Sequence, residues 1–186
     1  MDQEDKPKLF TDIRDILYLW IQNDGATKTN GLVSGDRVLY TIQNASQEKG
    51  GWEGWAQVEI AHFIKSSYPN LRVTREDGVY DGNTKRSDLV LQNGSGIRTI
   101  IELKCERGNV SSPKWIVDEV IKDAEKLQKT LRDEFLPAIY YAVGIAATKG
   151  ADKEIQSALD TGKIPRTGFY CKNSKIYVFW AESQVA

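Results

Sequence analysis

The sequence predicts an α/β fold with a mixed central β-sheet flanked by helices, in the order α-β-β-β-α-β. Residues 87–92 and 97–106 are apolar runs joined by turn-forming residues, as expected for two antiparallel strands buried on both faces. Residues 113–131 carry an apolar stripe at helical spacing, and residues 137–146 are almost wholly apolar. Because a helix between two strands is typical of a β-α-β unit, the strand at 137–146 is expected to run parallel to the one at 97–106.

The N-terminal part is predicted to supply the first helices and strand. Apolar side chains recur at helical spacing over residues 9–20. Residues 52–66 predict a second helix, which ends before Pro69 because the residue preceding a proline disfavours the helical region. Residues 71–75 alternate between polar and apolar as a strand does. Residues 23–51 are rich in Gly, Asn, Ser and Thr and are long enough to be an insertion or a loop.

The remaining patterns are short. Residues 38–42 fit either a short strand or a turn of helix. Residues 151–159 predict a short helix. Residues 168–171 and 175–180, joined across Asn173 and Ser174, predict a closing hairpin or edge strands.

The length of the chain indicates one domain. It has 186 residues, of which 40% are hydrophobic, enough for one core and too little for two. A single domain is therefore expected over residues 1–186. Its core is expected at about 52–148, with a helix and a variable loop in 1–51 and a helix with the closing hairpin in 149–186.

Charge and cysteine content limit the classes of function. A net charge of −1 and a pI near 5.9 exclude the broad basic field of many non-specific nucleic-acid binders. Cys105 and Cys171 lie far apart and no secretory signal is visible, so reduced cysteines and a cytoplasmic protein are expected, with a disulfide left open. The single histidine, His62, excludes a multi-histidine metal site. No apolar stretch approaches the length of a membrane span, so no membrane partner is expected.

The two central strands carry a candidate metal site. Glu102 and Lys104 are two residues apart in the second strand and therefore share one face. Asp88 opens the preceding strand, and the turn between the strands folds it back beside Glu102. Two carboxylates and an ammonium group at one end of a strand pair are typical of a divalent-metal site that hydrolyses phosphodiesters.

A further acid lies in the helix at residues 52–66. At about 100° per residue, Glu59 falls in the middle of a stripe formed by Trp52, Trp55, Ala56 and Phe63. A buried carboxylate needs a cation, a metal or hydrogen-bond donors, because leaving it bare is costly. Two interpretations stay open: Glu59 pairs with an arginine or lysine at the edge of the core, or it faces the metal site.

These residues resemble the motif of a known family. Asp88, a gap of thirteen residues, Glu102-x-Lys104 and an upstream helical glutamate, Glu59, are similar to the PD-(D/E)xK, or restriction-endonuclease-like, nuclease superfamily. The resemblance covers roughly residues 52–148 and implies a restriction-endonuclease-like core. Ser87 stands where the name-giving pattern has a proline, and many members of the superfamily share this departure.

The resemblance also implies roles for the motif residues. Asp88, Glu102 and Glu59 would bind Mg²⁺ or Mn²⁺, with the carbonyl of Leu103 as a further ligand. Lys104 would orient or help to deprotonate the attacking water and would stabilise the transition state. The alternative for Lys104 is an ordinary ion pair with Glu102 or with Glu106, which is itself expected to be a solvated charge at the rim.

Other polar and aromatic residues are candidates for supporting the site or binding the substrate. Three residues of the helix at 113–131 resemble the polar positions with which some members support the site: Asp123, Lys126 and Gln128. Basic residues near the motif in sequence are expected to contact phosphates: Arg72, Arg75, Lys85, Arg86 and Arg107. Three tryptophans could stack on bases, although the core suits Trp55 better: Trp52, Trp55 and Trp115.

The function that the resemblance implies is a metal-dependent nuclease, with an endonuclease favoured and DNA favoured over RNA as the partner. A homodimer stays open, as does an immunity protein if the chain is a toxin. The alternatives are a non-catalytic module that binds nucleic acid or protein on the same fold, and an unrelated α/β protein in which the motif is accidental.

Overall fold

The computed structural model describes nine parts of the chain: residues 13–22, 34–45, 51–81, 85–94, 96–108, 114–147, 150–164, 168–171 and 176–185. The turn expected at Asn173 and Ser174 lies outside them. None of the helices in these parts has both the length and the apolar character that a membrane span requires.

A six-stranded mixed sheet runs through the molecule in the order β1-β2-β3-β4-β6-β5. Only β3 and β4 pair in parallel; the other neighbouring strands of the sheet are antiparallel. The strands are β1 Arg72–Asp77, β2 Ser87–Gln92, β3 Arg98–Cys105, β4 Ala138–Ala146, β5 Gly168–Cys171 and β6 Ile176–Val185. The predicted α/β class with a mixed sheet is therefore confirmed.

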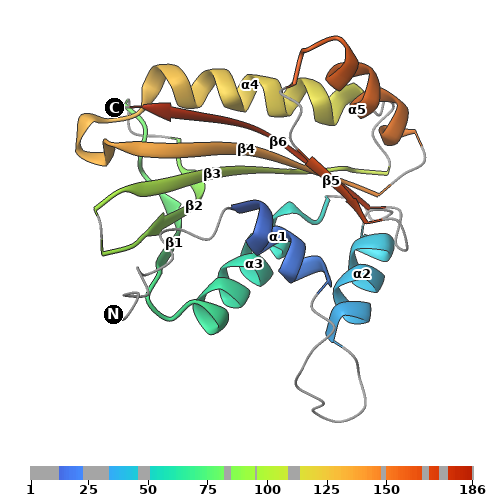
Figure 1. The fold of residues 1–186 in the computed structure, drawn as a ribbon, viewed down its shortest axis with the longest axis horizontal. Helices are drawn as coiled ribbons and strands as arrows, with labels where there is room; N and C mark the ends of the chain where they lie inside the picture. Colours follow the sequence, from blue (N-terminus) through green and yellow to red (C-terminus); the bar gives the residue numbers. More distant parts are fainter. Residues whose placement is uncertain are drawn as a thin grey trace, which may run out of the picture.

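Helices cover both faces of this sheet (Figure 1). On one face lie α1 Ile13–Gln22, α2 Ser34–Ala45 and α3 Glu53–Ser67; on the other lie α4 Lys114–Thr130 and α5 Ala151–Asp160. A short 3-10 helix, η1 Asp133–Phe135, connects α4 to β4. Each face has its own apolar core, which explains why the central strands are apolar on both sides.

The order of elements follows the prediction, since α3, three strands, α4 and β4 succeed one another along the chain. Residues 38–42, for which strand and helix were both open, belong to α2. The last strand is longer than the hairpin pattern indicates, because β6 continues to Val185 and pairs with the whole of β4. Strand β5 lies at the edge.

Helix α3 is buried on a different side from the one its tryptophans suggest. Its buried residues are Ala56, Gln57, Ile60, Ala61 and Ile64, and they belong with the strands to one core. The tryptophan side of the helix packs against α1 instead, where the ring centroids of Trp20 and Trp55 are 6.3 Å apart. A helix between a sheet and another helix is apolar on two sides, so its pattern does not single out the face that meets the sheet.

The hydrogen-bonded pairing of β2 with β3 stops before β3 ends, and polar side chains lie at that point. Their register ends at the pair Leu89 and Ile101. Asp88, which precedes Leu89, and Glu102, which follows Ile101, lie just beyond this last pair. There the backbone groups of β3 no longer bond to β2. Helix α3 lies against one side of the sheet here and α4 against the other.

Close contact between β4 and β6 gives a prediction about stability. Gly144 pairs with Phe179, and a Cβ atom on Gly144 would lie 2.3 Å from the Phe179 ring, which is buried. Gly144→Ala is therefore expected to lower the free energy of unfolding by about 1–3 kcal/mol, the usual cost of overpacking. Urea unfolding measures this loss. The control is Gly94→Ala, where a Cβ meets no described atom within 4 Å; equal effects of the two changes would contradict the packing.

Candidate functional site

Asp88 is buried at the beginning of β2 and accepts two hydrogen bonds. Its Oδ1 accepts from the side-chain amide of Gln57 on α3 at 2.7 Å. Its Oδ2 accepts from the backbone N–H of Leu103 at 2.6 Å. Because the pairing of β2 with β3 has ended, the Leu103 N–H is available to a side chain, and the bond fixes Asp88 against the middle of β3.

Glu102 is buried to 3% exposure and faces α4. The Tyr80 hydroxyl donates a short hydrogen bond to its Oε1, and the Lys126 Nζ lies 2.9 Å from the same oxygen. The Lys126 ammonium also lies 4.6 Å from the centroid of the Tyr80 ring. Glu102 is therefore held by a hydroxyl from one segment and a cation from another.

Lys104 lies between two further carboxylates. Its Nζ is 3.4 Å from Glu53 Oε1, at the start of α3, and 3.3 Å from Asp123 Oδ2 on α4. Asp123 Oδ1 lies 3.2 Å from the Nζ of Lys126, so Asp123 joins the two lysines. The ion pair expected for Lys104 under the alternative interpretation, with Glu102 or Glu106, is thus replaced by pairs with Glu53 and Asp123.

Burial and neighbouring charges shift the pKa values of Asp88, Glu102 and Lys104. Burial and the charge of Glu102 raise the pKa of Asp88 to about 7, against the Leu103 N–H and Lys104, which favour the ionised form. Burial also raises the pKa of Glu102, despite Tyr80 and Lys126. For Lys104, burial lowers the pKa, but nearby carboxylates, Glu53 first, outweigh it and raise the pKa above its ordinary value.

Sequence reasoning missed three contributors: Tyr80, Glu53 and Gln57, the last of which binds Asp88. Tyr80 lies in an irregular segment before β2 whose one described bridge is to Leu131, so no local pattern links it to Glu102. Glu53 stands in the first turn of α3 and accepts from Lys104 and, at 3.4 Å, from the backbone N–H of Cys105. An acidic residue in the first turn of a helix is ordinarily explained by its interaction with the helix dipole. The sequence therefore does not single out Glu53 as a partner of Lys104.

Of the two interpretations of Glu59, the helix geometry opposes the one in which it faces the metal site. Gln57 and Glu53, four residues apart on α3, reach Asp88 and Lys104. Glu59 is half-buried and lies about 200° around the helix from Gln57, so it points away from that face. Within the described parts, no three Asp, Glu, His or Cys side chains are grouped so as to hold a metal ion. The structure thus brings Asp88 and Glu102 together without Glu59.

The basic residues expected around the site lie in different places. Arg75 donates to the Gln57 side-chain oxygen at 3.2 Å and so supports the amide that binds Asp88. Lys85 and Arg86 are exposed just before β2, and Arg86 donates to the carbonyl of Glu76. The guanidinium of Arg107 covers a tryptophan ring at 5.4 Å.

Arg72 lies at the far end of the strand pair. It pairs with Gln92, four residues along β2 from Asp88, which is about 13 Å at the rise of a strand. Arg72 is therefore near the motif in sequence but distant from Asp88 in the sheet, and its contact with a phosphate stays a prediction.

Two further expectations about polar and aromatic residues are corrected. Glu106 is buried, not a solvated rim charge, and accepts from the backbone N–H of Ala147 at 2.8 Å. Trp52 is buried and donates to the Glu106 carbonyl at 2.8 Å, so its ring is not open to a base. Trp115 is half-buried beneath the Arg107 guanidinium. Gln128 is exposed, whereas its neighbour Lys126 reaches Glu102.

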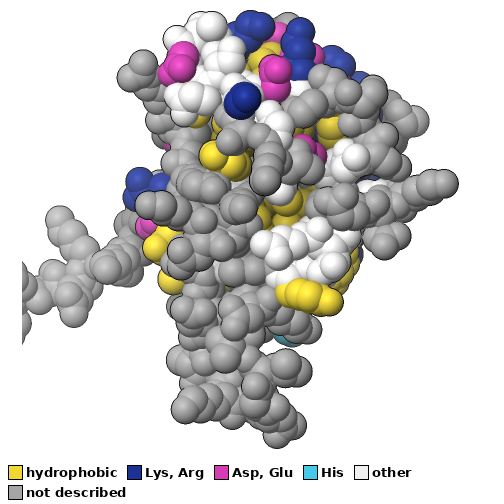
Figure 2. Space-filling view, turned by 90° about the vertical axis from the view of Figure 1, so that its right-hand side faces the viewer, with side chains coloured by type: hydrophobic (Ala, Val, Ile, Leu, Met, Phe, Trp, Pro, Cys, Tyr) yellow, Lys and Arg dark blue, Asp and Glu magenta, His cyan; other side chains and the backbone are white. Residues whose placement is uncertain are grey.

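The surface carries charges of both signs. Lys and Arg side chains mix with Asp and Glu side chains at the top of the face in Figure 2, where α5 lies in Figure 1. Any contact of this face with an anion would have to use local groups rather than a broad field.

Comparisons of the chain with protein-family models, with curated proteins and with solved structures found no match.

Proposed function

We propose that the protein is a metal-dependent nuclease of the PD-(D/E)xK type, which hydrolyses phosphodiester bonds of DNA or RNA. The observation that carries the proposal is the meeting of Asp88, Glu102 and Lys104 where the pairing of β2 and β3 ends. The order of elements and the mixed sheet are compatible with a restriction-endonuclease-like core.

The residue types and charges of the cluster suit a hard divalent cation. Among its described members, four carboxylates are opposed by two ammonium groups: Glu53, Asp88, Glu102 and Asp123 against Lys104 and Lys126. The raised pKa values of Asp88 and Glu102 mean that their ionised forms lack compensation, which a cation would supply. Carboxylate oxygens are the ligands that Mg²⁺ and Mn²⁺ prefer.

Asp88 and Glu102 would hold the ion, with the carbonyl of Leu103 beside them. When bound, Mg²⁺ supplies a water of lowered pKa and neutralises negative charge on the attacked phosphate. The Leu103 carbonyl lies 3.3 Å from the Nζ of Lys104, so this oxygen already faces positive charge.

Lys104 acts in this proposal as a cation rather than as a base. The carboxylates of Glu53 and Asp123 keep its pKa raised, so it stays protonated at neutral pH. A protonated lysine in a partly dehydrated site can stabilise the charge that develops on a phosphate, and it can orient a water through its N–H groups.

Other residues position the two metal-binding carboxylates. Tyr80 and Lys126 fix Glu102. Gln57 fixes Asp88, and Arg75 fixes Gln57, because a guanidinium donor on the amide oxygen turns the amide nitrogen toward Asp88. Loss of a contact that orients a metal ligand ordinarily lowers metal affinity or activity by about 10–100-fold.

One observation favours a second candidate, a non-catalytic module that binds nucleic acid or protein. Both carboxylate oxygens of Asp88 already accept hydrogen bonds from Gln57 and Leu103. A carboxylate satisfied in this way can serve the fold alone.

Cleavage of three substrates decides between the candidates: supercoiled plasmid, single-stranded DNA and total tRNA, each with Mg²⁺ or Mn²⁺ and each with EDTA. The nuclease is expected to cut at least one of them, and only with metal. The corrected site adds a matched pair of variants: Glu53→Gln is expected to slow cleavage about 10–100-fold because it releases Lys104, and Glu59→Gln to leave it near the wild-type rate.

Folded protein that cuts none of the three substrates would favour the binding module. Metal-dependent cleavage that is lost in Glu59→Gln and kept in Glu53→Gln would contradict the corrected site while leaving the nuclease in place.

A further inference from the structure

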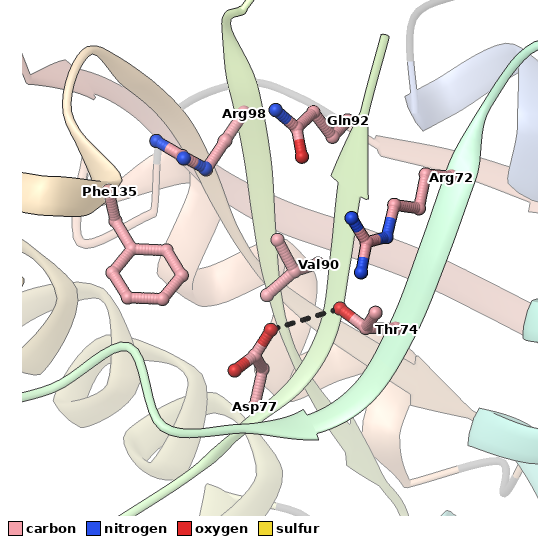
Figure 3. A pocket seen from close by; sticks show the side chains of 7 residues that line it. All are labelled: Arg72, Thr74, Asp77, Val90, Gln92, Arg98 and Phe135. Atoms are coloured by element: carbon pink, nitrogen blue, oxygen red, sulfur yellow. Dashed lines mark hydrogen bonds between the residues drawn. The ribbon is translucent and has the colours of Figure 1, made fainter.

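A row of hydrogen-bond donors crosses three strands at the end of the sheet away from the acidic cluster. Arg72 on β1 pairs with Gln92 on β2, and Gln92 pairs with Arg98 on β3. Directly paired residues place their side chains on the same face of a sheet, about 4.5–5.5 Å apart at Cβ. Two guanidinium groups and an amide are therefore adjacent on one surface (Figure 3).

These side chains line a hollow of about 180 Å³. Its other walls are Thr74, Asp77, Val90 and Phe135. Figure 3 shows the Arg72 guanidinium extending over the strands toward Val90, with the ring of Phe135 on the opposite side. The hollow thus has nitrogen donors on two sides, an aliphatic floor and an aromatic wall.

Two of the lining groups are already held in place. Arg98 donates to the carbonyl of Glu134 at 2.7 Å, and its guanidinium lies 5.2 Å from the centroid of the Phe135 ring. The Thr74 hydroxyl donates to Asp77 Oδ2 at 3.1 Å. Arg98 is thereby preorganised, and the negative charge of Asp77 is partly satisfied within the wall.

Arg72 differs from these groups. It is exposed, and among the described residues no hydrogen bond or ion pair occupies its guanidinium. A guanidinium presents a planar fork of N–H donors that matches the oxygens of a phosphate, and two such forks beside an amide can surround a dianion.

We propose that this hollow binds a phosphate monoester carried on a sugar, either as a free nucleotide or as the phosphorylated end of a nucleic acid. Arg72, Gln92 and Arg98 bind the phosphate, and the sugar lies against Val90 and Phe135. The hollow has several times the volume of a water molecule, which takes up about 30 Å³, so it has room for a phosphate group with part of its ester beside it.

The donor groups of the site lie apart from the acidic cluster. Gln92 and Arg98 lie four residues from Asp88 and Glu102 along their strands, about 13 Å away. The inference therefore goes beyond the proposed nuclease activity and does not depend on it.

Binding is measured by calorimetry in EDTA, so that no metal and no cleavage enter the result. The probes are a deoxynucleoside 5′-monophosphate, inorganic phosphate, and one short single-stranded oligonucleotide with either a 5′-phosphate or a 5′-hydroxyl. The wild-type protein is expected to bind the nucleotide more tightly than inorganic phosphate, and the 5′-phosphorylated oligonucleotide more tightly than the 5′-hydroxyl form. Which of the nucleotide and the phosphorylated oligonucleotide binds more tightly identifies the source of the phosphate.

Three variants assign the binding to this hollow. Arg72→Gln is expected to weaken nucleotide binding about tenfold or more without changing the melting temperature, because Arg72 is exposed. Asp77→Asn is expected to tighten it, since the change removes the negative charge of the wall and keeps an acceptor for Thr74. The control Arg14→Gln, an exposed arginine on α1, removes the same charge on the other side of the sheet and is expected to have no effect.

Equal loss in Arg72→Gln and Arg14→Gln would overturn the site, because only the net charge would then matter. Equal affinity for the 5′-phosphate and 5′-hydroxyl oligonucleotides would overturn the phosphate monoester. Binding of inorganic phosphate as tight as that of the nucleotide would overturn the sugar-bearing ligand.

Discussion

Glu102→Gln is expected to weaken the binding of Mn²⁺ and to lower metal-dependent cleavage by at least about a hundredfold. The change keeps the size of the side chain and a partner for the Tyr80 hydroxyl, but it removes one of the two charges proposed to hold the ion. Titration of Mn²⁺ by electron paramagnetic resonance measures binding without any substrate, and initial rates of nicking measure activity.

The same variant is expected to stay folded. Burial opposes the ionised form of Glu102, and Lys126 keeps Asp123 as an ion-pair partner, so the melting temperature should equal or exceed that of the wild type. The matched control is Glu125→Gln, an exposed position on α4 that loses the same charge. Wild-type Mn²⁺ affinity in Glu102→Gln, or an equal loss in Glu125→Gln, would contradict the assignment.

Metal binding and cleavage are expected to fall steeply below pH 7. A metal ligand must be deprotonated, and the pKa of Asp88 lies at about 7 in the folded protein without metal. Each pH unit below that value should weaken metal binding about tenfold, and above pH 8 the dependence should level off. Mn²⁺ affinity measured between pH 5 and pH 9 tests this; affinity that does not change across this range would contradict the role of Asp88.

The stability of the metal-free protein should change with pH in the opposite sense. The pKa of Asp88 rises from 3.8 to about 7 on folding, so between these values the folded state binds a proton that the unfolded state has lost. The free energy of unfolding therefore decreases as pH rises from about 4 to about 7. Urea unfolding in EDTA is expected to show this slope in the wild type and a shallower slope in Asp88→Asn.

The sequence predicts the central strands best, because strands buried on both faces are continuous apolar runs. Strands β2 and β4 are covered by apolar cores on both faces, so their residues form continuous apolar runs with clear ends. Asp88 and Glu102 could be paired in advance because a hairpin sets their register. The nearness of Asp88, Glu102 and Lys104 could therefore be predicted without the structure, while their role as a site stays a prediction.

What could not be predicted depends on contacts between distant segments. The approach of Tyr80 to Glu102 has no local signature, because an irregular backbone segment has no periodicity. The tryptophan stripe of α3 favours Glu59 over Glu53 and Gln57, but Trp55 on this stripe packs against α1, and the residues that reach the cluster lie on another side of the helix. Gln57 is neutral, so a search for charged metal ligands does not identify it, although its amide binds Asp88.

Nearness in sequence was misleading for Arg72. Strand β1 runs antiparallel to β2, so its first residue pairs with the end of β2 and its last residue, Asp77, pairs with Ser87 near the acidic cluster. Arg72 therefore lies beside Gln92 and Arg98 instead of beside Asp88, and this place is the basis of the proposed phosphate site.

The central claim is that Asp88, Glu102 and Lys104 form a metal-dependent centre for phosphodiester hydrolysis. Nicking of supercoiled plasmid by the wild type and by Lys104→Ala, side by side with Mg²⁺, Mn²⁺ or EDTA, tests it most directly. We expect the wild type to nick the plasmid only with metal and Lys104→Ala to lose at least about a hundredfold in rate while remaining folded. Nicking by the wild type that persists in EDTA, or that Lys104→Ala retains in full, would contradict the account.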